Sequence, residues 1–299
     1  PWAREDAVSL RVRHTVGLAD PVEAIPGCLQ ADGITGLKIK LAGDAEADLH
    51  RLGAIGRTLD GSGCAVERVT LDGNENYGSL DEYERLIAGL SAGRDQHVLI
   101  RQTRWIEQPF RRDRALAEEI APVLRRHADW PVVIDESDAR VHDLQHALAM
   151  GYAGTTHKSC KGVFKSMLHA VCLHDPCRRA GRPTLFSGED LTIVAPWSQA
   201  WDLTVAAAVG VDDIERNGQH FADGLSAFPP STVRTALEHY PWLYRATASA
   251  GAALRIERGW IEVPDAPVQP PALVGFTDVA PIDPSNAASK NPKFPRYSA

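Results

Sequence analysis

The sequence lacks the features that mark several other classes of protein. No run of about eighteen apolar residues occurs in its 299 residues, so we expect no segment that crosses a membrane. The first residues, PWAREDAVSL, have no basic flank before an apolar core, which argues against a secretory signal. The formal net charge of −7 argues against a nucleic-acid partner, because a phosphate-binding surface usually makes a domain basic.

Cysteine is also scarce. The five cysteines are odd in number and form no C-x-x-C pair, so neither a disulfide framework nor a zinc site is indicated. This usage fits a reducing compartment, and we expect a cytoplasmic location. What is present is ordinary for a globular protein, with 44% hydrophobic and 24% charged residues in a chain long enough for one large domain or two modest ones.

Residues 1–225 alternate short β-rich segments with helical patterns. For example, Ser79-x-x-Glu82 has the form of a capping box at the start of a helix. Such alternation predicts an α/β fold with a parallel sheet, and eight repeats favour a closed TIM-like (β/α) barrel over an open sheet. The predicted strands span residues 8–16, 36–41, 66–74, 104–110, 132–137, 152–158, 184–189 and 211–216.

Residues 226–299 have a different pattern. One helix is expected over 232–244, and the segment 253–263 (ALRIERGWIEV) predicts a hairpin with Arg258-Gly259 at its turn. The remainder is rich in Pro, Ser and Asn, so we expect an extended tail. This division predicts a barrel domain over 1–225 followed by a C-terminal helix, hairpin and tail.

Ionisable side chains follow the apolar runs of seven consecutive predicted strands. A single Asp after a strand is more often a helix cap or turn former than a ligand. In a parallel barrel, however, these strand ends converge on one mouth, where such folds place their chemistry. The series therefore predicts a shared site made of Lys38 and Lys40, Asp72, Glu107, Asp135, Lys158 with Lys161, Glu189 and Glu215.

The segment Gly36-Leu37-Lys38-Ile39-Lys40-Leu41 places two lysines on one face of a strand. One interpretation is an amphipathic strand with its lysines in water. The other is a strand buried on both faces, with its ammonium groups directed at an anionic ligand. The second would lower the pKa of each lysine through burial and mutual repulsion, which suits a base near neutral pH.

Three carboxylates on consecutive strands would repel one another in a mouth of low dielectric constant. These are Asp72, Glu107 and Asp135. A hard divalent cation removes the conflict, and oxygen ligands favour Mg²⁺. The pattern therefore predicts a magnesium centre beside the lysines.

Together these residues resemble the motifs of the enolase superfamily, in its mandelate racemase/muconate lactonizing enzyme branch. The resemblance runs over about residues 8–220, in the order of that family. The matching segments are K-x-K at Lys38–Lys40, D-x-N at Asp72–Asn74, I-E-Q-P at Ile106–Pro109, D-E-S at Asp135–Ser137 and the lysine of HKSCKG at Lys158.

The resemblance implies an enzyme that abstracts the proton α to a substrate carboxylate. Asp72, Glu107 and Asp135 would hold Mg²⁺, which would stabilise an enediolate as a Lewis acid. Lys40 and Lys158 would remove or return the proton on opposite faces of the carbon. Lys38 would bind the substrate carboxylate and lower the pKa of its neighbour.

Further residues are candidates for contact with substrate or for support of the site. Glu136 would orient Lys158, and the strand-seven segment LFSGED, with Glu189 and no His, favours the two-lysine version of the chemistry. The segment Ile214–Asn217 lacks the D-x-D pair of the family's dipeptide epimerases, so a dipeptide substrate is disfavoured. The candidates are Asn74, Glu136, Lys161, Glu189, Glu215 and His220, whereas His157 should face away and pack.

The family's α+β capping domain, which covers the mouth and selects the substrate, is not expected within these residues. The outcome of the reaction stays open between racemisation or epimerisation, cycloisomerisation and acid-sugar dehydration of a small carboxylate. The resemblance also implies a homo-oligomer. Two alternatives are a non-catalytic or truncated metal-binding barrel and a Schiff-base aldolase using Lys158, although the aldolase leaves the three carboxylates unexplained.

Overall fold

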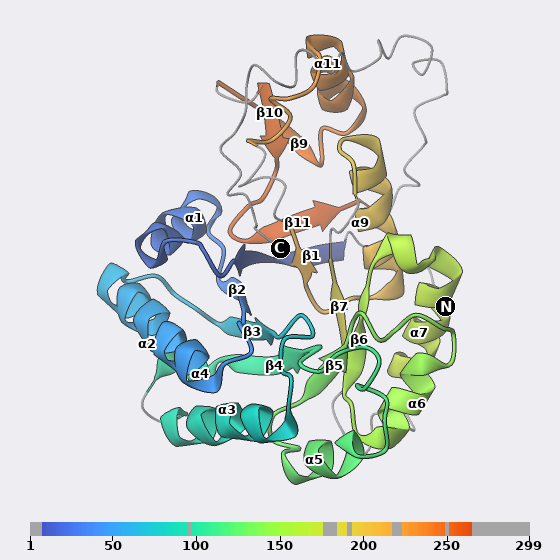
Figure 1. The fold of residues 1–299 in the computed structure, drawn as a ribbon. Coiled ribbons are helices and arrows are strands. Elements are labelled where there is room, and N and C mark those ends of the chain that lie inside the picture. The colour runs from blue at the N-terminus through green and yellow to red at the C-terminus, as the bar shows by residue number, and fades with distance from the viewer. Residues whose placement is uncertain are drawn as a thin grey trace, which may run out of the picture. The chain divides into compact units, whose positions relative to one another are not determined.

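A closed barrel of eight parallel strands forms the centre of the structure, a computed structural model that describes residues 8–94, 97–175, 184–189, 193–216, 223–248 and 251–264 (Figure 1). Each strand pairs with the next in sequence, and β1 also pairs with β8 to close the ring. The predicted TIM-like barrel is therefore confirmed. Its strands are β1 (Val8–Val16), β2 (Gly36–Lys40), β3 (Arg68–Asp72), β4 (Thr103–Glu107), β5 (Val132–Ile134), β6 (Gly154–His157), β7 (Leu185–Gly188) and β8 (Ile214–Glu215).

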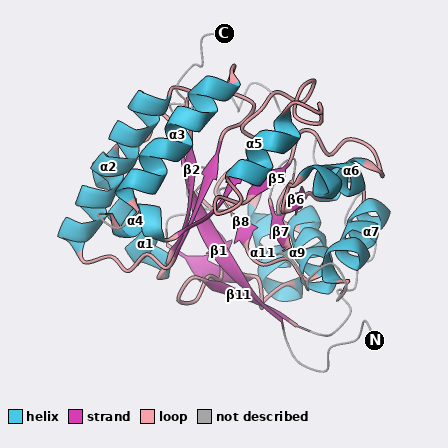
Figure 2. Ribbon diagram, turned by 90° about the horizontal axis from the view of Figure 1, so that it is seen from below, coloured by secondary structure: helices cyan, strands magenta, loops and turns pink. Residues whose placement is uncertain are grey.

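Helices connect these strands and surround the barrel, as Figure 2 shows. None of those in the described part of the chain combines the length and apolar character that a membrane crossing needs. They comprise α1 (Ile25–Asp32), α2 (Ala45–Ser62), α3 (Leu80–Gly93), α4 (Val98–Arg101), α5 (Ile120–Arg126), α6 (Asp143–Met150), α7 (Val163–His174) and α9 (Trp197–Val209), with 3-10 turns η1 (Val22–Ala24) and η2 (Ser159–Lys161).

Local sequence signals account for where the helices begin. The Ser79 side chain accepts the Glu82 backbone N–H at 3.2 Å, which confirms the predicted cap at the start of α3. The other half of the capping box is used differently, because Glu82 Oε1 accepts the backbone N–H of Ala45 at 2.7 Å and so caps α2. Apolar residues of both helices then pack on the outside of the barrel, among them Leu52, Ile55, Leu59, Tyr83, Leu86 and Leu90.

The segment after the barrel contains α11 (Pro230–His239), β9 (Tyr244–Thr247), β10 (Gly251–Leu254) and β11 (Trp260–Val263). The predicted turn at Arg258-Gly259 is present, with φ values of 51° and 81° and backbone hydrogen bonds between Glu257 and Trp260. The predicted hairpin is wrong, because β10 pairs with β9 whereas β11 pairs antiparallel with β1. Only β11 has a distant partner, since Val263 pairs with Val8, whereas β10 pairs with the strand just before it in sequence. The predicted tail beyond residue 264 lies outside the described residues.

Strand register brings the predicted site residues to one level of the barrel. Lys40 on β2 lies beside Asp72 on β3, and Asp72 lies beside Glu107 on β4. Leu37 and Ile39 alternate with the lysines and are fully buried, as are Asp72 and Glu107. The parallel ladder thus gathers charge at the carboxyl ends of the strands.

Candidate active site

The ammonium of Lys38 lies inside a group of carboxylates. Its Nζ atom is 3.0 Å from Asp72 Oδ2, 3.0 Å from Glu107 Oε1, 2.6 Å from Glu189 Oε1 and 3.1 Å from Glu215 Oε2. The side chain is 0% exposed, so the interpretation that places this lysine in water is wrong. It faces anionic groups, but those groups belong to the protein itself.

The expected lowering of the lysine pKa is also wrong for Lys38 and for Lys158. Burial by itself lowers the pKa of Lys38, but Asp72 and Glu107, followed by Glu189 and Glu215, outweigh burial and hold that pKa well above its usual value. The same balance raises the pKa of Lys158, where Glu189 and Asp135 oppose the effect of burial. The prediction considered repulsion between lysines and left out their attraction to the carboxylates.

The two predicted catalytic lysines contact different parts of the carboxylate group. Lys40 Nζ is 2.5 Å from Asp72 Oδ2, and its side chain is 25% exposed. Lys158, directly after β6, forms ion pairs with Asp135 and, at 2.8 Å, with Glu189 Oε2. Because β2 and β6 are four places apart in a ring of eight strands, the two lysines reach the site from opposite walls of the barrel.

Three buried carboxylates, Glu107, Asp135 and Glu189, come close enough to hold one metal ion. Their nearest oxygen atoms lie within 4.8 Å of one another. Two of them, Glu107 and Asp135, are predicted ligands, and the third member of this close group is Glu189. Asp72 is engaged by Lys38, by Lys40 and by the backbone N–H of Asn74 at 2.9 Å.

The chemistry of this group fits a hard divalent cation. Glu107 Oε2 is buried, and no hydrogen-bond partner reaches it within the described ranges. Burial, followed by the nearby Asp72 and Glu189, raises the pKa of Glu107 well above its usual value. A buried oxygen without a donor, among carboxylates that repel each other, is satisfied by a cation that prefers oxygen ligands.

The other residues predicted to contact substrate or to support the site differ in what their side chains contact. Glu136 does not orient Lys158 as expected; its Oε1 instead accepts the side-chain amide of Asn74 at 3.2 Å. Lys161 Nζ lies 2.8 Å from Asp135 Oδ1, and Glu215 accepts the Thr15 hydroxyl at 2.6 Å in addition to Lys38. His220 lies outside the described residues.

His157 faces away from the cluster, as predicted. Its Nδ1 is 2.8 Å from the Ser166 hydroxyl, and its ring is buried. Burial lowers the pKa of His157 to about 4, against the opposing attraction of Asp202. The imidazole is therefore neutral and structural at neutral pH.

Two buried ion pairs that support the site were not predicted. Arg13 Nε lies 2.8 Å from Asp213 Oδ1, and Arg216 lies 2.6 Å from Asp202, which also accepts the Ser159 hydroxyl at 2.7 Å. Arg13 carried a usable signal, because an arginine inside the apolar strand VSLRVRHTV is the same anomaly as the lysines of β2. Asp202 carried none, since it lies within a helix and resembles a solvent-facing residue.

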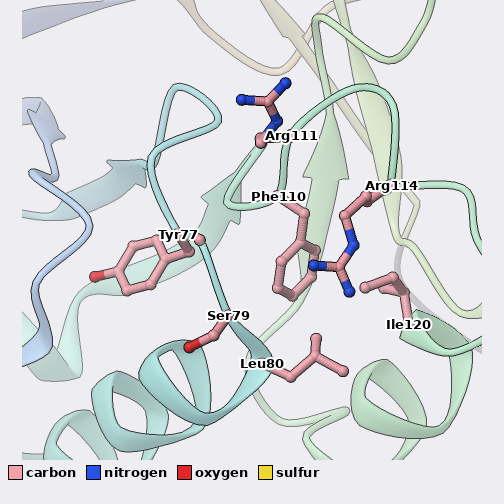
Figure 3. A pocket seen from close by; sticks show the side chains of 8 residues that line it. Tyr77, Ser79, Leu80, Phe110, Arg111, Arg114 and Ile120 are labelled. Carbon is pink, nitrogen blue, oxygen red and sulfur yellow. The ribbon is translucent and has the colours of Figure 1, made fainter.

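Two hollows lie near the ends of β3 and β4. One, shown in Figure 3, is lined by Tyr77, Phe110, Arg114 and Ile120, and its volume of about 10 Å³ holds at most one water molecule. The other is an open hollow of about 300 Å³, lined only by polar residues: Asn74, Glu75, Asn76, Arg111, Arg112 and Asp113. The second has room for part of a small ligand.

The family model for enolase C-terminal domain-like proteins matches residues 22–159. Over this segment, which is less than half of the chain, the barrel is similar to the enolase C-terminal domain-like family. No curated protein sequence matches the chain.

Solved structures share the fold of this barrel. A mandelate racemase/muconate lactonizing protein from Herpetosiphon aurantiacus is 22% identical, with a TM-score of 0.55, and the match covers 86% of this chain and 64% of that one. A dipeptide epimerase from Methylococcus capsulatus, complexed with Mg ion, is 22% identical, with a TM-score of 0.54 and coverage of 87% and 67%.

A 3,6-anhydro-D-galactonate cycloisomerase from Zobellia galactanivorans is 14% identical, with a TM-score of 0.57 and coverage of 87% and 62%. The chain therefore spans about two thirds of the length of these solved structures or less.

Proposed function

We propose that this barrel is the catalytic domain of a Mg²⁺-dependent enzyme that removes a proton from the carbon next to a substrate carboxylate. The observation that carries the proposal is the placement of Lys40 and Lys158 on opposite walls of the barrel, around one group of buried carboxylates. A carbon bound between them has one amine on each face.

Glu107, Asp135 and Glu189 would hold the metal, with Asp72 as a further candidate ligand. Mg²⁺ bound there supplies positive charge to a substrate carboxylate and makes the adjacent carbon more acidic. Lys40 then takes or returns a proton at one face, and Lys158 does so at the other. Racemisation or epimerisation uses both lysines on one carbon, whereas dehydration or cycloisomerisation needs a base on one face only.

Features of the surroundings favour a polar acid as substrate. The open hollow beside Asn74 is lined by amides and charged groups, which suits a hydroxylated chain better than an apolar one. A dipeptide is disfavoured, because Arg216, in the region where dipeptide epimerases have their acidic pair, is buried against Asp202. An acid sugar or a similar hydroxy acid is the preferred substrate class.

Solvent deuterium exchange tests the proposal. Lys40→Ala and Lys158→Ala should each abolish exchange at the face of the carbon that the replaced lysine serves, in an acid that the unaltered protein turns over, while calorimetry still detects Mg²⁺ binding. Lys165→Ala is a matched control, since Lys165 is also a buried lysine but pairs with Asp138. Exchange retained at both faces in both active-site variants would refute the assignment.

A non-catalytic metal-binding barrel is the second candidate, because the three close carboxylates could hold an ion without any turnover. It predicts Mg²⁺ binding without exchange across a screen of acid sugars and amino-acid derivatives. A Schiff-base aldolase is disfavoured, because Lys158 is paired with two carboxylates, and borohydride trapping with a keto acid would have to label this residue.

The cell location and assembly state are further parts of the proposal. We propose a cytoplasmic protein, on the basis of its scattered cysteines, and a homo-oligomer. Sedimentation of the purified chain measures the second directly.

A further inference from the structure

Lys38 connects four strands of the barrel through a single ammonium group. The carboxylates that it contacts come from the ends of β3, β4, β7 and β8, while the lysine itself comes from β2. These contacts are between 2.6 and 3.1 Å long, and the lysine is fully buried. Among the residues that the structure describes, no other side chain contacts carboxylates from the ends of four strands.

The carboxylates depend on this ammonium to different degrees. Asp72 also contacts Lys40, and Glu189 also contacts Lys158. Among the described residues, Lys38 is the one cation that forms an ion pair with Glu107. Removal of the Lys38 charge would therefore leave Glu107 buried beside other carboxylates with no cation in contact.

Buried carboxylates that lie this close cannot all remain charged without a compensating cation. A newly folded chain meets this requirement before any metal ion arrives, because its own lysine is tethered at the centre of the group. Lys38 also contacts two of the three candidate metal ligands, through Oε1 of Glu107 and Oε1 of Glu189.

We propose that Lys38 is an internal cation that holds the carboxylate cluster together in the absence of a divalent ion, so that the barrel folds without metal. A second part of the proposal rests on the metal site of the proposed function. Lys38 competes with Mg²⁺ for Glu107 and Glu189, and its ammonium weakens the affinity of that site for the ion.

Thermal unfolding of Lys38→Met tests the first part, with Lys40→Met as a matched control. Both variants lose one ammonium from the same strand, but Lys40 contacts one carboxylate and is partly exposed. With excess EDTA, Lys38→Met should lower Tm by about 10 °C, because removing one partner of a buried ion pair is strongly destabilising. Lys40→Met should lower Tm by only about 2 °C. A Tm for Lys38→Met equal to that of the control overturns the proposal.

A double variant keeps the test decisive if Lys38→Met does not fold. Lys38→Met with Glu215→Gln removes one positive and one negative charge, and Glu215 is outside the group of three candidate ligands. Recovery of a folded protein in EDTA supports an electrostatic role for Lys38. A double variant no more stable than the single variant shows that Lys38 acts through packing, which contradicts the proposal.

Calorimetry with Mg²⁺ alone tests the competition. The affinity for Mg²⁺ should rise at least about tenfold in Lys38→Met, and saturating Mg²⁺ should raise the Tm of this variant by more than that of the unaltered protein. Equal affinities overturn the competition. Absence of Mg²⁺ binding to every variant contradicts the metal site of the proposed function, while the unfolding data in EDTA still decide the role of Lys38.

Discussion

The neutral, buried imidazole of His157 predicts how the stability of this barrel depends on pH. Its pKa is about 4 in the folded protein, because burial opposes the charged form, whereas an exposed histidine has a pKa of about 6.5. The unfolded chain therefore binds a proton as the pH falls below 6.5, and the folded chain does not do so until about pH 4. The stability contribution is complete above pH 6.5 and is lost between these two values.

The expected size of the effect follows from the two pKa values. One pKa unit corresponds to about 1.4 kcal/mol, so this histidine alone should lower the free energy of unfolding by about 2 kcal/mol between pH 7 and pH 5. Carboxylates titrate over a similar range, and a single protein therefore cannot isolate the contribution of His157. The difference between the unaltered protein and His157→Gln does so, since glutamine stays neutral and can hydrogen-bond Ser166.

Urea unfolding at pH 7 and pH 5 measures this difference. The unaltered protein should lose about 2 kcal/mol more than His157→Gln over this interval. Titration of the His157 ring by NMR gives the folded-state pKa independently. Equal losses in the two proteins, or a ring pKa near 6.5, would show that the imidazole has access to water and that the described packing is wrong.

Two further changes test the site and the loop that follows β2. Glu189→Gln should weaken Mg²⁺ binding by at least about tenfold in calorimetry, because Glu189 belongs to the close group of carboxylates. This loss of affinity should be larger than the loss in Asp72→Asn. A larger loss in Asp72→Asn would favour Asp72 over Glu189 as the third ligand. Gly43→Ala should destabilise the protein by about 1–3 kcal/mol in urea unfolding, since Gly43 has φ +86° and a Cβ there would lie 2.3 Å from the backbone oxygen of Asn76. Gly61→Ala is its control, because Gly61 lies within α2 with open space around its Cβ position, and this substitution should be neutral or stabilising.

The eight strands and their convergence could be predicted from sequence because both depend on local information. Alternating β-rich and helical segments imply parallel strands, and parallel strands place residues such as Asp72, Glu107 and Asp135 at the same end of the barrel. Which residues a side chain contacts depends, in contrast, on how far it extends across the interior of the folded barrel. Lys38 extends from β2 to β7 and β8, and this contact determines its charge environment.

The errors in the sequence-based interpretation have the same physical origin. The segment 253–263 has a correct turn, but β10 pairs with the neighbouring β9 and β11 pairs with β1, and no local pattern specifies that the partner of β11 lies over 200 residues away in the chain. Asp202 could not be distinguished from a surface residue, because its contact with Arg216 exists only once α9 packs on the barrel. The local turn was predictable from sequence, whereas the contacts between residues far apart in the chain were not.

The two halves of β1 have different neighbours. Val8–Arg11 pair with β11, near the C-terminal limit of the described chain, while Arg13–Val16 pair with β2 and Val12–Arg13 with β8. During synthesis, β1 therefore has an edge that stays without its β11 partner until residues 260–263 have emerged. A nascent chain stalled before this point exposes that edge to strands of other chains, which favours aggregation.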